Sequence, residues 1–169
     1  FCRLRDRASL ESALKSAAVE PVGEEAWQLF RAEWGTARVG FEIDAEDTPV
    51  EAGLESQVAE GKGAPFPGET ALAARRRTGA IKRLAGFSVA GDEMPPVGAS
   101  VRVGGHLVDR VRSVVRSPRV GIIGMTALPT STEAAGTPLV IESDGRGWTA
   151  DVVRRPFVSR STPPLEPEA

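Results

Sequence analysis

The hydrophobic pattern of this chain changes its period at Gly79, and this change constrains the fold more than any other feature. Before Gly79, apolar residues recur at helical spacing, whereas after it they alternate with polar residues over short runs. Six of these runs read as strands separated by glycine-rich turns: residues 82–89, 100–103, 107–115, 121–127, 137–143 and 147–153. Short strands at this spacing predict a small antiparallel barrel or sandwich rather than βαβ units.

The residues before Gly79 are predicted to form helices joined by loops. Helical periodicity covers residues 8–18, 25–33 and 69–77, and Asp47-Thr48-Pro49 predicts a turn. The run FCRLR at residues 1–5 alternates apolar and basic side chains, which predicts a short strand against which residues 8–18 pack. Because the chain opens on this strand-like run and on Phe1 rather than methionine, we expect it to begin inside a larger protein.

Composition and charge limit the classes of partner. With 41% hydrophobic and 26% charged residues, the sequence is that of a globular protein, and it has no apolar run of the roughly 20 residues that a membrane span needs. Residues 1–60 hold 13 acidic and 6 basic side chains, whereas residues 61–169 hold 10 and 15, a split that can orient two lobes toward each other. The acidic pI of 5.6 argues against nucleic acid.

The single cysteine, Cys2, points to no cysteine chemistry. One thiol can build neither a disulfide framework nor a metal site, so we expect no metal and a reducing, cytoplasmic setting.

One carboxylate stands out within residues 26–54. Glu33 lies on a helical segment among three large apolar side chains, Trp27, Phe30 and Trp34. A carboxylate in such surroundings needs a partner, which either another part of the protein or a ligand can supply. We expect the two tryptophans to fill the core.

Short motifs follow one another in a fixed order from the helix that holds Glu33 to the end of the last strand. The helix end reads FRAEWG at residues 30–35, and the connector reads GFEID at 40–44 and TPVEAGL at 48–54. Later landmarks are Lys62, FPG at 66–68, Ser117-Pro118 with Gly121, Gly136-Thr137 with Leu139, and Pro156-Phe157. This order, over about residues 20–158, resembles the folate-binding superfamily of the glycine cleavage T protein.

The resemblance implies an α+β fold, with residues 1–78 as the C-terminal part of a folate-binding α/β lobe and residues 79–158 as a small antiparallel β-barrel. The last segment, residues 159–169, is proline-rich and acidic at its end, and this composition predicts a disordered tail. The resemblance also implies a tetrahydrofolate site. The glutamate at the helix end, here Glu33, would bind the pterin ring through its amide and amino donors. A basic residue of the following loop, here Lys62, would face the glutamate tail of folate.

Departures from the family pattern limit what can be carried over. Glu69 follows the FPG motif where many relatives have a basic residue, and Ala64 replaces the cysteine of the iron–sulfur-cluster assembly branch. In the transferase branch, the aspartate that positions the folate nitrogen lies in an N-terminal lobe, and no residue of this chain matches it. We therefore assign no catalytic residue, and we interpret His106, beside Gly105, as a turn residue.

Three functions fit these observations. The first is part of a tetrahydrofolate-dependent aminomethyl or methyl transferase, completed by an N-terminal lobe or a partner chain and acting on a one-carbon donor. The second is a non-catalytic folate-binding assembly factor related to the iron–sulfur-cluster branch, supported by Lys62-Gly63, which matches the pattern of that branch. The third is a barrel that binds another subunit through Arg110, Arg112, Arg116 and Arg119, although such an arginine-rich strand pair is commonly a solvated face.

Overall fold

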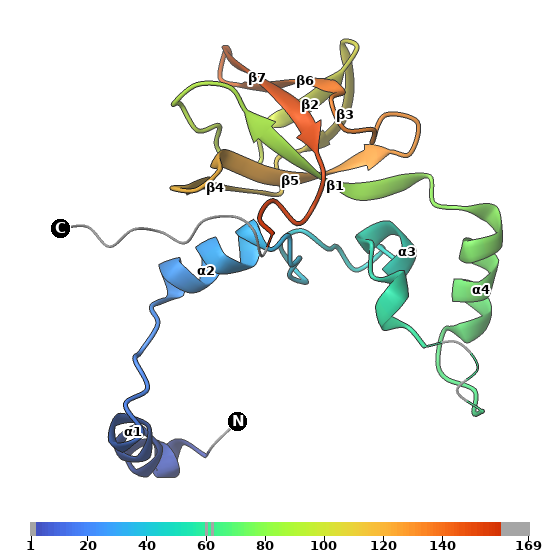
Figure 1. Ribbon diagram of the computed structural model, residues 1–169. Helices are drawn as coiled ribbons and strands as arrows, with labels where there is room; N and C mark the ends of the chain where they lie inside the picture. The colour runs from blue at the N-terminus through green and yellow to red at the C-terminus, as the bar shows by residue number, and fades with distance from the viewer. Residues whose placement is uncertain (1–2, 60, 62, 160–169) are drawn as a thin grey trace.

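The computed structural model describes residues 3–59, 61 and 63–159, with helices in the first half of the chain and strands in the second (Figure 1). The helices are α1 (Arg7–Ser16), α2 (Glu24–Glu33), α3 (Pro49–Ala52) and α4 (Glu69–Thr78). The strands are β1 (Lys82–Val89), β2 (Ser100–Val103), β3 (His106–Arg110), β4 (Ser113–Ser117), β5 (Gly121–Pro129), β6 (Pro138–Ser143) and β7 (Arg146–Val153). This arrangement confirms the predicted α+β fold with an antiparallel barrel.

The strands form one curled sheet in the order β3-β2-β6-β7-β1-β5-β4, in which every paired neighbour is antiparallel. Tight turns at Gly104-Gly105 and Asp144-Gly145 join β2 to β3 and β6 to β7, and all four of these residues have positive φ. The sheet curls far enough for Asp109 of β3 to accept a hydrogen bond from the backbone N–H of Ala127 in β5, at 2.7 Å.

The core lies inside this curl. The alternation of buried and exposed residues is clearest in β7, where Trp148, Ala150 and Val152 are buried and the residues between them are exposed. The other members of the core cluster come from several strands and from the corner between β3 and β4, and they include Phe87, Val101, Val111, Ile122, Leu128, Leu139 and Ile141. Gly124 of β5 has no room for a side chain, because an added Cβ would lie 2.4 Å from the Phe87 ring and 2.5 Å from the Ser113 carbonyl oxygen.

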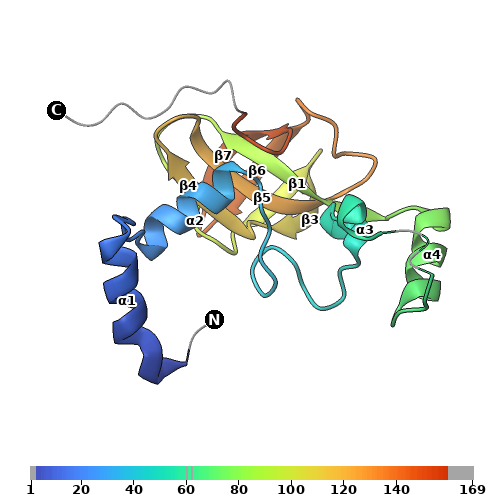
Figure 2. The same cartoon turned by 60° about the horizontal axis from the view of Figure 1, so that its bottom comes forward.

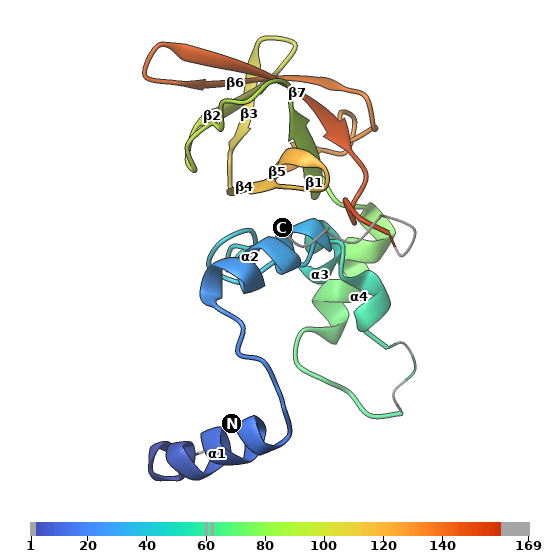
Figure 3. The same ribbon diagram turned by 60° about the vertical axis from the view of Figure 1, so that its left-hand side comes forward.

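The helices lie to one side of the barrel. Figure 3 shows α2 running beneath β4 and β5, and Figure 2 shows α1 standing apart from the sheet. The short helix α3 lies against β1 and α4. It begins with a capping box, in which the Glu51 carboxylate accepts hydrogen bonds from the Thr48 backbone N–H and hydroxyl, with Pro49 in the first turn. The turn predicted at 47–49 is thus the start of a helix.

Two sequence predictions for the N-terminal segment are wrong. Leu4–Asp6 is a 3-10 turn, closed by the Asp6 N–H on the Arg3 carbonyl at 2.8 Å, instead of a strand. Helix α1 follows it and buries none of its residues, so the predicted packing of this helix on a strand does not occur. The first two residues of the predicted strand, including Cys2, lie outside the described part of the chain.

The predicted strand at 107–115 is also wrong, because the chain bends at Val111-Arg112 and forms β3 and β4. The Val111 N–H bonds to the Ala99 carbonyl, whereas the next N–H, that of Arg112, bonds to the Met125 carbonyl. The chain therefore leaves the β2 side of the barrel and joins β5 at this corner. The predicted domain boundaries stay predictions, and the predicted tail lies outside the described residues except for Ser159.

Candidate functional site

Glu33 is the last residue of α2 and lies on the face of that helix that meets the barrel. The buried residues of α2 are Arg31, Ala32 and Glu33, and Glu33 is only 2% exposed. Gly35, with φ of +64°, then turns the chain away, as a residue without Cβ can do at a helix end. The helix thus delivers one carboxylate to the edge of the barrel.

The Glu33 carboxylate meets two side chains, one at the end of β4 and one in the turn between β4 and β5. The Ser117 hydroxyl donates to Oε1 at 2.5 Å, and the Arg119 Nε donates to the same oxygen at 3.3 Å. The Arg119 Nη2 forms an ion pair with Oε2. Ser117 is itself buried and accepts hydrogen bonds from the backbone N–H groups of Arg119 and Val120, so the turn is held rigidly around the carboxylate.

The backbone of Glu33 is fixed as well. Its carbonyl accepts hydrogen bonds from the N–H groups of Phe157 and Val158, at 2.9 and 3.2 Å, in the segment that follows β7. In the same segment, the Arg155 Nη1 donates to the Gly35 carbonyl at 2.9 Å. The end of α2 is therefore tied to the barrel at two sequence-distant places.

These contacts keep Glu33 ionised. Burial alone would raise its pKa, but the hydrogen bonds from Arg119 and Ser117 and the charge of Arg119 outweigh burial and leave the pKa lowered. An ionised carboxylate is purely an acceptor, so it can bind paired N–H donors, such as a guanidinium or an aminopyrimidine edge. In this structure, Arg119 supplies those donors.

A second polar cluster joins the connector after α2 to the barrel. Arg112 is 5% exposed and donates to Asp109 through Nε at 2.8 Å and to Asp47 through Nη1 at 2.9 Å. Lys82 also pairs with Asp47, at 2.9 Å. Burial would raise the pKa of Asp47, but the hydrogen bonds from Lys82, from the Asp44 N–H and from Arg112 lower it to about 2. This cluster is structural, because its charges satisfy one another.

The arginine-rich strand pair is thus not a uniformly solvated face. Arg112 is buried and Arg119 is bound to Glu33, whereas Arg110 and Arg116 are exposed. Arg116 reaches the backbone carbonyl of Asp92. The hypothesis that all four arginines present a subunit-binding surface is therefore wrong for the buried Arg112, whereas Arg119 is partly exposed and its guanidinium is engaged by Glu33.

Lys62, the residue predicted to face the folate tail, lies outside the residues that the structure describes, so its role stays a prediction. Described residues on either side of it in sequence, such as Val58 and Phe66, line an apolar hollow of about 270 Å³ between α3 and α4. Its lining is almost wholly apolar, with Val58, Phe66, Ala71 and Leu72 among the contributors. Nothing in that lining brings a described charge toward Glu33.

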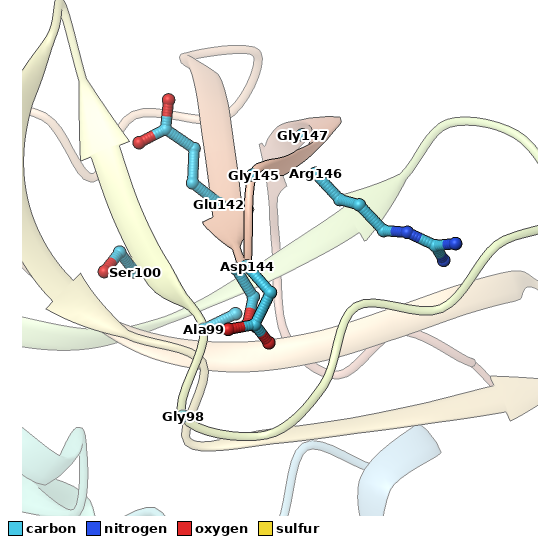
Figure 4. Close-up of a pocket in the computed structure, with 9 residues that line it drawn as sticks. Gly98, Ala99, Ser100, Glu142, Asp144, Gly145, Arg146 and Gly147 are labelled. Carbon is cyan, nitrogen blue, oxygen red and sulfur yellow. The ribbon is translucent and has the colours of Figure 1, made fainter.

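Another hollow, of about 560 Å³, lies at the turn between β6 and β7 (Figure 4). Its charged residues, Glu142, Asp144 and Arg146, point in different directions in this view. None of the described residues that line it belongs to α2 or contacts Glu33. We therefore do not treat it as the functional site.

Other candidate chemistry is sparse in the described part of the chain. His106 is an exposed residue that opens β3 after the Gly104-Gly105 turn. Within residues 3–59, 61 and 63–159, no group of three or more His, Cys, Asp or Glu side chains is placed to hold a metal ion. None of the described helices is long and apolar enough to cross a membrane.

Comparison with known proteins decides the nature of the barrel. A family model described as "Glycine cleavage T-protein C-terminal barrel domain" matches residues 82–159. The second half of this chain is a glycine cleavage T-protein C-terminal barrel. The likeness extends beyond the T-protein barrel, since an aminomethyltransferase of Rubrobacter xylanophilus is 35% identical over 161 residues, 95% of this chain. One from a Nostoc species is 33% identical over 88% of it.

A solved structure agrees. The crystal structure of the glycine cleavage system aminomethyltransferase T from Bartonella henselae superimposes with a TM-score of 0.80 and 27% identity over 90% of this chain. The match covers 43% of that structure and 42% of the Rubrobacter protein. The chain therefore spans about two fifths of the length of these relatives, which carry a T-protein barrel together with a larger remainder.

Sequence reasoning identified Glu33 but not the residues that hold it. Ser117 carried a signal, because it belongs to the Ser117-Pro118 motif, but that motif alone does not name its partner. Arg119 carried no signal that separated it from the exposed Arg116, since both are arginines of the same basic segment, three residues apart.

Proposed function

We propose that this chain is the barrel-bearing part of a tetrahydrofolate-dependent one-carbon transferase, with an aminomethyl group as the preferred cargo. The observation that carries the proposal is the likeness to aminomethyltransferases over 95% of the chain, which includes α2 and its terminal Glu33 as well as the barrel. Residues 1–78 would then complete a folate-binding lobe, and residues 79–158 would form the barrel beside it.

In this proposal Glu33 binds the pterin ring of tetrahydrofolate. The pterin presents an amide N–H and an amino group side by side, and an ionised carboxylate accepts from such a pair with both oxygens. The lowered pKa of Glu33 and its fixed position at the end of α2 support this role. Since Arg119 and Ser117 hold the carboxylate in this structure, the pterin must displace the Arg119 guanidinium or share Glu33 with it.

The remaining roles are divided between this chain and a second lobe. From this chain, Lys62 would hold the folate tail carboxylates, which a lysine ammonium can do as a point charge. Tetrahydrofolate would accept the one-carbon unit, and the groups that position its reacting nitrogen would come from a lobe like the larger remainder of the relatives. This chain's contribution is to bind and orient the pterin and to support the site from the barrel side.

The test uses a fusion in which the part of the Rubrobacter aminomethyltransferase outside the match precedes this chain. Tetrahydrofolate binding is measured by isothermal titration, and transfer of a one-carbon unit from aminomethyl or N-methyl donors is assayed separately. Binding with transfer supports the transferase, and binding without transfer supports the non-catalytic folate-binding alternative. Absence of binding contradicts both.

A further inference from the structure

Three aromatic side chains form an exposed stripe along the face of α2 that points away from the barrel. Trp27, Phe30 and Trp34 are 50%, 51% and 38% exposed, which makes wrong the expectation that the tryptophans fill the core. Their spacing of three and four residues places them on one helical face. We call these three side chains the aromatic stripe.

The three rings of the aromatic stripe pack against one another in the chain by itself. The rings of Trp27 and Phe30 are stacked with centroids 5.9 Å apart, and those of Phe30 and Trp34 lie 6.3 Å apart. The opposite face of α2 is anchored to the barrel through Glu33. The stripe is therefore a rigid apolar surface in a fixed orientation, a form that suits a binding surface because little side-chain entropy remains to be lost.

Exposure of apolar side chains is concentrated in this part of the molecule. Among described residues, ten of the fifteen exposed large apolar side chains lie within residues 4–41, and only five lie in the longer barrel region. Helix α1 adds Leu10 and Leu14, and it buries no residue although a helix of ten residues is marginal in water by itself. The apolar side chains of the barrel are mostly buried, whereas the described helical half leaves many of its apolar side chains exposed.

The relatives indicate what kind of cover fits. About three fifths of the Rubrobacter and Bartonella proteins lies outside the match, so each has a large remainder that this chain lacks. The start of α2 is acidic, with Glu20, Glu24 and Glu25 exposed, although Glu24 pairs with Arg38 at 3.5 Å and Glu25 lies toward β4. This acidic start disfavours an anionic membrane surface, so a protein surface is the cover that fits.

Resting on the proposed function, we infer that the aromatic stripe is the docking surface for the lobe that completes the transferase, whether that lobe precedes this chain on one polypeptide or is a separate chain. The lobe would bring an apolar patch against Trp27, Phe30 and Trp34. Docking would bury these three rings at the hydrophobic centre of an interface.

The test measures burial of the stripe without folate. Phe30→Cys is introduced in a background where other cysteines are serine, and its reaction with a thiol reagent is compared in the chain alone and in the fusion. We expect the reaction to slow by about tenfold or more in the fusion. Leu107→Cys, on β3 and 60% exposed, is the matched control and should react equally in both.

A second variant guards against a local effect of the cysteine. Trp27→Asp with Phe30→Asp should leave the circular dichroism of the chain alone unchanged, because both side chains are half-exposed, but should make the junction of the fusion sensitive to limited proteolysis. Equal Phe30→Cys rates in the chain and the fusion would overturn the inference. Self-association of the chain alone that these aspartates abolish would also overturn it, since the stripe would then be covered by a second copy of the chain.

The two proposals fail separately. Protection of Phe30→Cys without folate binding would retain the interface and reject the folate proposal. Folate binding without protection would retain the folate proposal and reject the interface.

Discussion

Glu33 at the end of α2 and Arg119 in the turn between β4 and β5 form an ion pair across 86 residues of sequence. The pair joins the helical half of the chain to the T-protein barrel. It also occupies the carboxylate that we propose as the pterin acceptor, so the contact that stabilises this structure competes with the proposed ligand. The following predictions separate these two roles and test the polar clusters around them.

Removal of Arg119 is expected to destabilise the fold, because it leaves the buried Glu33 carboxylate with Ser117 as its remaining side-chain donor. We expect Arg119→Ala to lower the free energy of unfolding by roughly 1–3 kcal/mol. The measurement is urea denaturation of both single variants and of Arg119→Ala with Glu33→Gln. A coupling energy near zero in this double-mutant cycle would show that the ion pair contributes no stability.

Stability should fall in acid as Asp47 takes up a proton. Its pKa is about 2 in the folded chain against an ordinary value of 3.8, a difference worth roughly 2 kcal/mol. Because the folded pKa is the lower one, this contribution is complete above about pH 4 and is lost as the pH falls toward 2. Unfolding free energies measured from pH 7 to pH 2.5 should therefore converge for wild type and Asp47→Asn. Asp144→Asn, at an exposed turn, should track wild type throughout, and parallel curves for wild type and Asp47→Asn would refute the assignment.

Two neighbouring arginines should differ sharply in their effect on stability. Arg112→Met removes the donor shared by Asp47, Asp109 and the Glu42 carbonyl, and we expect a loss of about 3–5 kcal/mol. Arg116→Met changes an exposed side chain and should cost about 0.5 kcal/mol or less. Similar midpoints for the two variants in urea would contradict the burial of Arg112.

Gly124 and Gly147 form a matched pair for testing the packing of the barrel. An added methyl group at Gly124 would collide with Phe87 and the Ser113 carbonyl, whereas one at Gly147 meets no atom within 4 Å. We expect Gly124→Ala to lower stability by roughly 2 kcal/mol or more and Gly147→Ala to be neutral within about 0.5 kcal/mol. Thermal unfolding followed by circular dichroism measures both, and a neutral Gly124→Ala would show that the sheet is less tightly curled there.

Much of the barrel could be predicted from the sequence, because alternating apolar residues and glycine turns are local signals. The corner at Val111-Arg112 could not, since the strand pattern runs through it without interruption. What breaks the strand is a change of backbone partner from Ala99 to Met125, together with Arg112 turning inward to Asp47 and Asp109. Both causes depend on residues distant in sequence.

The candidate site, too, could be predicted only in part from the sequence. Glu33 could be chosen from the sequence because its motif and its apolar neighbours are adjacent to it. Its partners could not, because Ser117 and Arg119 are brought to it only when the barrel closes. The exposure of Trp27 and Trp34 was missed for a related reason, since helical spacing shows that two apolar side chains share a face but not whether anything covers that face.

The central claim is that Glu33 binds tetrahydrofolate, and isothermal titration of the fusion with tetrahydrofolate tests it most directly. Wild type, Glu33→Gln and Arg119→Gln are compared, because both variants break the same ion pair but only the first removes the carboxylate. The account predicts that Glu33→Gln weakens binding by about tenfold or more, while Arg119→Gln binds at least as tightly as wild type. Absence of binding by the wild-type fusion, or equal affinity of wild type and Glu33→Gln, would contradict it.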